Sequence, residues 1–391
     1  MQENSSSYHR GKRDIICFSL SRWNAEISSP AVSLARELAK HHRVFFIEHP
    51  YSIKDVLLGK KTLGKNDSHP TENVTVITPA AVLPINFLPA GKLYNWCSAI
   101  NNSILLKSLK KVVVENNIDS YIFINFFDPF FLRSIPADIK PEKYVYQCMD
   151  DMSQVEYTRR HGVNLEDEII RKADLVLCTS RQLTRMKSAI SPRVHFHPNA
   201  ADFNLFNQAA TRKFSKPEEM NFGNKKIIGF FGSIEYRTDF NLLKKVALFH
   251  TNKILFLIGP IAGTEHVEAE LDKMPNVVFA GARQLTSLPA YLQHIDCAII
   301  PYKKNVLTSS IYPLKINEYL AAGKPVVTTS FSEDIRSFYP YAFVAENDEE
   351  FITAIDAVIN TDDEHKKTMR IEAASLNTWT KRVEEFWELI S

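Results

Sequence analysis

A lysine and a glutamate stand three positions apart at the start of a predicted helix in the C-terminal half. In IPYKKNVLTSSIYPLKINEYLAAGKPVVTTS (300–330), a strand ends at Tyr302 and a helix begins near Pro313. The start of a helix offers unpaired N–H groups and partial positive charge, which suit a diphosphate. Lys315 could neutralise phosphate and Glu318 could accept hydrogen bonds from ribose hydroxyls, because the two share a helix face. The alternative is an ordinary surface ion pair.

A second loop in the same half has residues suited to phosphate. In GFFGSIEYRTDF (229–240), a strand ends in Gly232-Ser233 and a helix follows. Gly232 would let a ligand approach the backbone, and Arg237 could clamp a phosphate. This joint is common to all α/β domains, so it is a weak signal by itself. Neither it nor LIGPIAG (257–263) reads G-x-G-x-x-G, which argues against a dinucleotide cofactor and a dehydrogenase.

An acidic pair follows a predicted strand in the N-terminal half. In KYVYQCMDDMSQVEY, the strand ends before Asp150 and Asp151. Ligands of open α/β sheets bind at the carboxyl ends of the strands. Either aspartate could accept a proton from a hydroxyl or orient that hydroxyl. The alternative is a helix N-cap, a common role for aspartate. Glu48, His49 and Asp128 also end predicted strands at this edge.

The loop SRWNAEISSP after the first predicted strand should reach the same edge. Trp23, Asn24 and Ser29 could contact a substrate there, and an aromatic ring such as that of Trp23 can stack on a sugar. A structural lid is the alternative. His161, His195 and His197 have no metal-ligand spacing, so we expect them to be structural.

The elements that position these residues form a regular series. Short apolar, β-branched runs recur with room for a helix between them, which is typical of strands buried on both faces of a parallel sheet. The predicted strands are 14–20, 43–50, 74–80, 121–129, 143–151, 175–180 and 194–200, then 226–232, 253–260, 276–281, 296–302, 324–330 and 341–346. Predicted helices include 30–42, 238–250, 288–295, 312–323 and 376–391.

Strand–helix alternation twice over predicts an α/β protein with two Rossmann-like, doubly wound parallel-sheet domains and a cleft between them. A length of 391 residues suits two domains of average size. The expected divisions are a disordered lead-in at 1–12, an N-terminal domain at 13–200, a linker at 201–224, a C-terminal domain at 225–372 and a final helix at 373–391 that crosses back to the first domain.

The composition excludes several classes of protein. The chain is 45% apolar and 24% charged, as in soluble globular proteins. It has no run of about 18 apolar residues that would span a membrane. The N-terminus lacks the apolar core of a secretory signal, so we expect a cytoplasmic protein. Its five cysteines are odd in number and show no metal-ligand spacing, so we expect buried thiols and no metal.

The charge is unevenly distributed. Residues 1–200 carry 26 Lys and Arg against 20 Asp and Glu, a balance of +6, whereas residues 201–391 carry 21 against 25, a balance of −4. The first half could face an anionic surface. The segments 53–66 and 105–117 mix basic with apolar residues and suit a peripheral contact with anionic lipid at the inner face of the cell membrane. Random scatter of charge and solvated helix faces are the alternatives.

The C-terminal half resembles a known family. PLKINEYLAAGKPVVTT is similar to the donor-site signature of GT-B glycosyltransferases, and most similar to the large retaining family (glycosyl transferases group 1) that uses nucleotide-diphosphate sugars. FFGSIEYRTDFNLL resembles the start of that family's donor domain. HPNAADFNLF resembles its interdomain stretch, with Ala200-Ala201-Asp202 in place of Gly-Val-Asp, and WTKRVEEFWELI resembles its C-terminal helix. The resemblance covers most of 194–391 and rests mainly on strand order over 14–190.

The resemblance implies roles for the donor residues. Lys315 and Arg237 would contact the donor diphosphate, beside the Gly232-Ser233 loop. Glu318 matches the second glutamate of a family pair and would contact the ribose.

The first glutamate of that family pair is replaced in this chain. Ser310 stands at its position, which leaves the donor sugar and the stereochemical course open. The amides of Ser309, Ser310 and Ile311 would remain available to sugar or phosphate. In the N-terminal domain, Asp150 or Asp151 follows the strand after which related enzymes place a histidine or aspartate near the reacting carbon.

The implied activity is transfer of a sugar from a nucleotide-diphosphate donor to a hydroxyl of a glycan or lipid-linked acceptor, as in cell-surface polysaccharide synthesis. Trp23, Asn24 and Ser29 would contact the acceptor. Cofactor, metal and nucleic acid are not expected. A sugar-nucleotide epimerase of the same fold, or a catalytically idle subunit that binds a glycan or a partner, are the alternatives.

Overall fold

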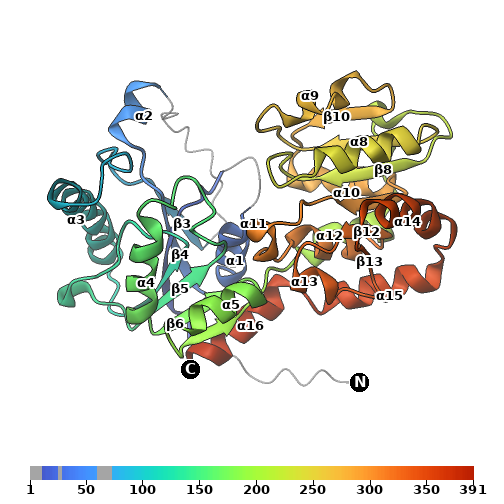
Figure 1. The fold of residues 1–391 in the computed structure, drawn as a ribbon. Coiled ribbons are helices and arrows are strands. Elements are labelled where there is room, and N and C mark those ends of the chain that lie inside the picture. The colour runs from blue at the N-terminus through green and yellow to red at the C-terminus, as the bar shows by residue number, and fades with distance from the viewer. Residues whose placement is uncertain (1–10, 25–28, 60–72) are drawn as a thin grey trace. The chain divides into compact units, whose positions relative to one another are not determined.

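The computed structural model describes residues 11–24, 29–59 and 73–391. The chain divides into two compact units (Figure 1). Unit 1 contains the described residues of 11–198 together with Val383–Ser391, and unit 2 contains Asn199–Arg382. Most of the expected lead-in (1–10) and part of the basic segment 53–66 (60–66) lie outside the described residues.

Unit 1 is built on a seven-stranded sheet with the order β3-β2-β1-β4-β5-β6-β7. Every pairing of neighbouring strands is parallel. The strands are β1 (Asp14–Ser19), β2 (Arg43–Glu48), β3 (Val74–Ile77), β4 (Tyr121–Phe126), β5 (Lys143–Cys148), β6 (Leu175–Cys178) and β7 (Val194–Phe196).

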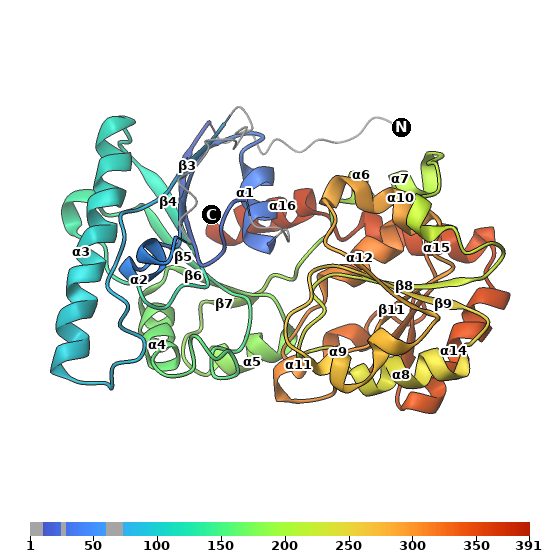
Figure 2. The ribbon, with the colours of Figure 1, turned by 90° about the horizontal axis from the view of Figure 1, so that it is seen from above.

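Helices cover both faces of this sheet. Figure 2 shows α3, α4 and α5 on one face, with α1 and the end of α16 on the other. The apolar runs of the strands fit this arrangement, because all six residues of β4 are buried. The helices are α1 (Pro30–Leu38), α2 (Ile53–Leu57), α3 (Lys92–Glu115), α4 (Gly162–Lys172), α5 (Arg181–Ser188) and α16 (Trp379–Ile390), with a 3-10 turn η1 (Ala137–Ile139).

Unit 2 repeats the scheme on six parallel strands in the order β10-β9-β8-β11-β12-β13. These strands are β8 (Ile227–Phe231), β9 (Ile254–Ile258), β10 (Val277–Gly281), β11 (Cys297–Ile300), β12 (Val326–Thr329) and β13 (Phe343–Ala345).

The helices of unit 2 also form two layers. In Figure 2, α6, α7, α10, α12 and α15 lie on one face of the sheet, and α8, α9 and α14 lie on the other. The helices are α6 (Phe203–Phe206), α7 (Gln208–Thr211), α8 (Phe240–Phe249), α9 (Glu265–Glu268), α10 (Leu288–Gln293), α11 (Val306–Ser309), α12 (Leu314–Ala321), α13 (Glu333–Arg336), α14 (Asp348–Asn360) and α15 (Glu364–Ser375), with 3-10 turns η2 (Glu218–Met220), η3 (Leu271–Lys273) and η4 (Leu285–Ser287).

The predicted two-domain α/β fold is confirmed, and each of the thirteen predicted strands is present. All five cysteines are buried free thiols. The segment expected as a linker, 201–224, is grouped with unit 2 and contains α6, α7 and η2. No helix among the described residues is long and apolar enough to cross a membrane.

Each sheet reverses its strand order once, between β1 and β4 in unit 1 and between β8 and β11 in unit 2. At such a point the loops that leave the two adjacent strands run to opposite faces of the sheet. Ligands of open α/β sheets bind outside the carboxyl ends of the strands at this position. The loops after these four strands are therefore where a site should be sought.

Candidate functional site

In unit 2, Gly232 follows β8 directly at the reversal of strand order. Its φ is +128°, a conformation that favours glycine. A Cβ atom there would lie 2.1 Å from Cε and 2.6 Å from Nζ of Lys315. Gly259, at φ +143°, approaches equally closely, since its own Cβ would lie 2.0 Å from the carbonyl oxygen of Gly232. The absence of side chains at both glycines lets Lys315 lie against the backbone at the end of β8.

Tyr302, in the loop that follows β11, holds the ammonium group of Lys315 in place. Lys315 Nζ donates a hydrogen bond of 2.8 Å to the Tyr302 hydroxyl. The ammonium also lies 5.4 Å from the ring centroids of Phe230 and Tyr302. Both Phe230 and Tyr302 are buried, so the lysine is held at the switch point by one side chain of β8 and one from the loop after β11. The sequence analysis did not single out Tyr302.

Glu318 lies one turn further along α12 and is only 5% exposed. It makes no ion pair with Lys315 within 4.0 Å, because the lysine is directed to Tyr302. The surface ion pair that the spacing left open is therefore absent. Burial raises the pKa of the Glu318 carboxyl to about 8, while the charge of Lys315 lowers it and that of Asp202 raises it further. A buried carboxyl without a hydrogen-bond donor among the described residues is costly unless a ligand supplies one.

The first turn of α12 has no side-chain cap. Its N-cap residue is Pro313, whose side chain cannot accept a hydrogen bond. By contrast, α8, α13 and α14 are capped by Asp239, Ser332 and Asn347, each of which accepts from a main-chain N–H. The exposed N–H groups and partial positive charge at the start of α12 are thus left to a ligand or to water.

The amides of Ser309, Ser310 and Ile311 do not remain available, and this expectation is wrong. The segment forms α11 and its C-terminal turn, in which Ser309 N–H donates to Asn305, Ser310 N–H to Leu307 and Ile311 N–H to Thr308. The Ser310 hydroxyl is buried and donates to the Leu307 carbonyl at 2.8 Å. Ser309 Oγ likewise donates to the Val306 carbonyl at 2.7 Å.

Glu235 occupies the loop between the predicted phosphate ligands Ser233 and Arg237. Ser233 Oγ donates to one carboxylate oxygen at 3.1 Å, and Arg237 pairs with the other. The sequence analysis did not consider this carboxylate. The loop is also tied to β11, because Lys303 N–H donates to the Arg237 carbonyl at 2.9 Å. Arg237 therefore lies at the switch point with its guanidinium held by a neighbour.

In unit 1, Asp151 caps a turn. Its Oδ1 accepts from the Ser153 N–H at 3.0 Å and from the Ser153 hydroxyl at 2.7 Å, and the side chain is 6% exposed. The alternative, a helix N-cap, takes a different form here, because turns rather than a helix extend to the start of α4 at Gly162. Asp150 is half-buried beside it at the end of β5. Capping of the turn therefore explains the position of the Asp151 carboxylate, whereas Asp150 lies at the carboxyl edge of the sheet.

The three residues predicted to contact an acceptor differ in environment. Trp23 is buried, and its ring packs against Phe46 with 5.1 Å between centroids. The main-chain N–H of Trp23 donates to the Glu48 carboxylate at 2.9 Å. This geometry favours the structural alternative for Trp23. Asn24 is exposed, and Ser29 caps α1 by accepting from the Ala31 N–H.

The strand-ending residues His49 and Asp128 form a pair at the carboxyl edge of the unit 1 sheet. His49 Nδ1 lies 2.8 Å from Asp128 Oδ2, and its Nε2 lies 3.2 Å from the Tyr157 hydroxyl. Asp128 is fully buried and also accepts the N–H groups of Phe130 and Phe131. The carboxylate accepts Nδ1–H, and in the neutral imidazole this leaves Nε2 as a hydrogen-bond acceptor.

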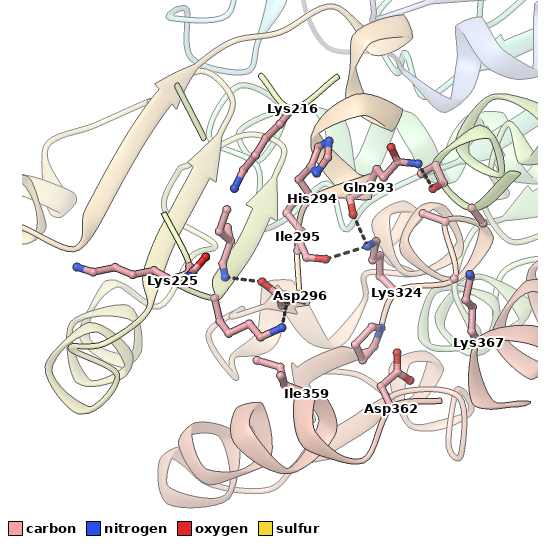
Figure 3. A pocket seen from close by; sticks show the side chains of 18 of the residues that line it. Lys216, Lys225, Gln293, His294, Ile295, Asp296, Lys324, Ile359, Asp362 and Lys367 are labelled. Atoms are coloured by element: carbon pink, nitrogen blue, oxygen red, sulfur yellow. Dashed lines mark hydrogen bonds and ion pairs between the residues drawn. The ribbon is translucent and has the colours of Figure 1, made fainter. Parts of the chain in front are cut away.

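A basic pocket of about 640 Å³ lies at the opposite, amino edge of the unit 2 sheet (Figure 3). Two of its lysines, Lys324 and Lys226, make structural contacts. Lys324 Nζ donates to the carbonyls of Gln293 and Ile295 at the end of α10, and Lys226 pairs with Asp296. Burial lowers the pKa of Lys324 to about 8, which weakens it as an anion ligand near that pH. This pocket is a useful comparison for the switch-point site.

No group of three or more His, Cys, Asp or Glu side chains in the described part of the chain has metal-binding geometry. The chemistry available at the two switch points is thus that of a lysine, an open helix start and a buried carboxyl in unit 2, and of a histidine–carboxylate pair in unit 1.

Comparison with known proteins agrees with this arrangement. Residues 225–361 match the family model described as Glycosyl transferases group 1. The chain is 31% identical over 236 residues to the putative teichuronic acid biosynthesis glycosyltransferase TuaH of Bacillus subtilis (strain 168). That match covers 57% of this chain and 58% of the relative's length.

Solved structures share the fold at low identity. Sucrose-phosphate synthase from Thermosynechococcus elongatus superposes with a TM-score of 0.68 at 15% identity, covering 97% of this chain and 98% of that one. Anabaena HepE in complex with UDP and glucose gives 0.64 at 14% identity, covering 96% and 99%. An α,α-trehalose-phosphate synthase from Burkholderia xenovorans in complex with glucose-6-phosphate gives 0.69 at 12% identity, covering 97% and 100%. The fold is that of the GT-B glycosyltransferases.

Proposed function

We propose that this chain, whose residues 225–361 belong to the group 1 glycosyl transferases, transfers a sugar from a nucleotide-diphosphate donor to a hydroxyl acceptor. The observation that carries the proposal is the arrangement at the unit 2 switch point. Lys315 lies against Gly232 at the end of β8, next to an uncapped helix start and one turn before the buried Glu318. These groups match the parts of a nucleoside diphosphate in charge and in order along the helix.

Each group has a role in this proposal. The diphosphate accepts hydrogen bonds from Lys315 Nζ and from the first N–H groups of α12, which also stabilise its charge. The ribose hydroxyls donate to the Glu318 carboxyl, which supplies the donors that it lacks in the described residues. Arg237 exchanges Glu235 for a phosphate oxygen when the donor binds.

Unit 1 binds the acceptor in this proposal, and Asp150 orients its hydroxyl at the carboxyl edge of the sheet. The acceptor is a growing cell-surface glycan or its lipid-linked precursor. Support comes from the similarity to a relative whose name places it in teichuronic acid synthesis. No metal takes part, and the leaving nucleoside diphosphate is stabilised by Lys315 and the helix start.

The proposal is tested by nucleotide binding to matched lysine variants. UDP, GDP, ADP and dTDP are titrated by calorimetry into the parent protein, Lys315→Ala and Lys225→Ala. We expect one nucleotide to bind the parent, and Lys315→Ala to weaken it at least tenfold, about 1.4 kcal/mol. Lys225 lines the basic pocket at the amino edge, so Lys225→Ala removes the same charge from unit 2 without affecting the switch point.

Two outcomes would contradict the proposal. One is that none of the four nucleotides binds the folded parent protein. The other is that Lys225→Ala weakens binding as much as Lys315→Ala, which would place the nucleotide at the amino edge or reduce the effect to net charge. Transfer of labelled sugar from the matching nucleotide sugar to a cell-surface glycan then measures the activity itself.

A further inference from the structure

A second pocket, of about 530 Å³, lies wholly within unit 1 at the carboxyl edge of its sheet. This volume is typical of small-molecule sites. Its lining is mainly apolar, with Val82, Ile85, Phe87, Phe130 and Phe131 among the residues. The polar residues that line it are Arg22, His49, Ser52, Asp55, Asn86, Ser98, Asn101 and Tyr157. Among these, we consider Arg22, His49 and Tyr157 as substrate ligands.

His49 gives the pocket a directed hydrogen-bond acceptor. The buried Asp128 holds its Nδ1–H, so Nε2 is the atom left for a partner. That atom lies 3.2 Å from the Tyr157 hydroxyl, which is longer than the 2.7–2.8 Å typical of an O–H donor. Tyr157 is 47% exposed and so has room to move aside. A substrate hydroxyl could therefore take its place on Nε2.

Arg22 gives the pocket a cation with spare hydrogen-bonding capacity. Its Nη1 is buried and makes no hydrogen bond to any residue in the described part of the chain. The nearest carboxylate oxygen, Glu48 Oε2, is 3.8 Å away, and the guanidinium stacks on the Tyr51 ring at 3.4 Å. Glu48 instead accepts from Trp23 N–H and the Thr78 hydroxyl. A buried guanidinium nitrogen that has only a long ion pair and no hydrogen bond to the described residues is suited to an anionic oxygen such as that of a phosphate.

The rim of the pocket is apolar and held in place. Phe87 lines the pocket yet is 68% exposed. Its carbonyl accepts a hydrogen bond of 2.6 Å from Arg160, and the next carbonyl, of Leu88, is 3.0 Å from His161 Nε2. These contacts hold the backbone around Phe87 in place while its side chain stays exposed.

Other large apolar side chains next to the pocket-lining residues in sequence are also exposed. Leu57 and Leu58 follow Asp55, and Leu93 and Trp96 precede Ser98; all four are at least 60% exposed. Exposed apolar side chains on the segments that line a pocket are typical of an interaction site. An alkyl chain is the occupant that these side chains and Phe87 favour.

We propose that this pocket binds the acceptor, and that the acceptor is a sugar joined through a phosphate to an apolar chain. A sugar hydroxyl other than the one that Asp150 orients donates to His49 Nε2, the phosphate pairs with Arg22, and the chain leaves over Phe87 toward α2 and the start of α3. That the ligand serves as the acceptor rests on the proposed function. The chemical class of the ligand rests on the pocket alone.

Direct binding with three related probes tests the class of ligand. Decyl glucosyl phosphate has sugar, phosphate and chain; glucose 1-phosphate lacks the chain; and decyl glucoside lacks the phosphate. Each is titrated below its micelle concentration. We expect the first to bind at least tenfold more tightly than either of the others. Equal affinity for all three, or no binding of the first, would overturn the proposal.

Variants assign the parts of the ligand to the pocket. Arg22→Gln should remove the gain from phosphate, and Phe87→Ser should remove most of the gain from the chain. Phe249→Ser is the matched control, because Phe249 is 60% exposed on α8 in unit 2. An equal loss in Phe249→Ser would show that the chain binds without a site. His49→Asn should weaken all probes that carry the sugar, and retention of their full affinity would exclude the histidine from the site.

The donor nucleotide distinguishes this inference from the proposed function. The same variants are titrated with the nucleotide that binds the parent, and we expect its affinity to be unchanged in Arg22→Gln and Phe87→Ser, which also verifies folding. If no nucleotide binds while decyl glucosyl phosphate does, the proposed function fails and the pocket stands. If the nucleotide binds and no probe does, the pocket assignment fails alone.

Discussion

At the scale of residues, the switch-point site in unit 2 depends on two neighbouring glycines and one lysine. The Lys315 stem occupies the space that a side chain at Gly232 would fill, and the Gly232 carbonyl occupies the space that a side chain at Gly259 would fill. Small residues at this joint therefore position the cation, and the chemistry is assembled by backbone approach as well as by side chains.

Gly232→Ala should damage both stability and nucleotide binding. The new methyl group would meet Lys315 Cε at 2.1 Å and its backbone φ of +128° is strained for alanine, so we expect a loss of about 1–3 kcal/mol in unfolding free energy and at least tenfold weaker nucleotide binding. The control is Gly223→Ala, at φ +62° with nothing within 4 Å. It should lose only about 1 kcal/mol and keep its affinity. Equal nucleotide affinity in the two variants would contradict the account.

Glu318 should make stability depend on pH. Burial raises the pKa of its carboxyl from 4.5 to about 8. Between these values the unfolded chain has released the proton that the folded protein retains, so the free energy of unfolding falls as pH rises toward 8 and changes no further above it. Urea unfolding of the unliganded Glu318→Gln protein should lack this fall. The free energy of unfolding of Glu318→Gln should rise relative to that of the parent between pH 5 and pH 8, by at most about 1.4 kcal/mol per pH unit. A constant difference between the two proteins would refute the burial argument.

Helix spacing placed Lys315 and Glu318 on one face, and the strand-to-loop joint marked Gly232, because both are local signals. The family resemblance is what assigned the three residues to one donor site. The sequence did not predict that Tyr302 holds the lysine, since a pairing thirteen positions apart depends on how β11 and α12 pack. The helix α11 was a missed local signal. Asn305 and Thr308 form a reciprocal capping box there, and this spacing identifies the start of a helix. The amides that were expected to face the donor instead donate hydrogen bonds within this helix and its last turn.

At the scale of elements, the strands were the most predictable part of the molecule. The central strands are apolar runs buried on both faces, as β4 and β8 illustrate, whereas the edge strands β3, β7, β10 and β13 are only partly buried. Except for 276–281, which ends where β10 ends, the predicted strands extend one to four residues too far at their carboxyl ends, because the apolar pattern continues into loops such as the one after Phe126. The helix N-cap that was the alternative for Asp151 is replaced by a turn, in which Asp151 accepts from Ser153 as it would in a cap.

Removing one partner of the buried ion pair between α4 and α5 should lower the free energy of unfolding more than removing both. Glu166 and Lys187 are 2.6 Å apart, with side chains 0% and 7% exposed. Glu166→Met leaves a buried lysine uncompensated, so we expect a loss of about 3–5 kcal/mol in urea unfolding. The double variant Glu166→Met with Lys187→Met should lose less than half of that amount. A loss in the double variant equal to the sum of the two single variants would show that the charges are not coupled.

At the scale of the whole molecule, two units of the same architecture carry different chemistry. Unit 2 offers a cation, an open helix start and a buried carboxyl at its switch point, whereas unit 1 offers a histidine–carboxylate pair and an apolar pocket. The charge balance of +6 in residues 1–200 and −4 in 201–391 follows the same division. The fold alone could not assign these roles, because a doubly wound sheet supports many activities.

The central claim is that a nucleoside diphosphate binds at the switch point of unit 2, and hydrogen–deuterium exchange with and without that nucleotide tests it most directly. We predict slower exchange in peptides that cover 232–238 and 314–318, with the basic pocket around 216–226 and 293–296 unchanged. Slower exchange confined to the basic pocket, with the switch-point peptides unaffected at saturating nucleotide, would contradict the account.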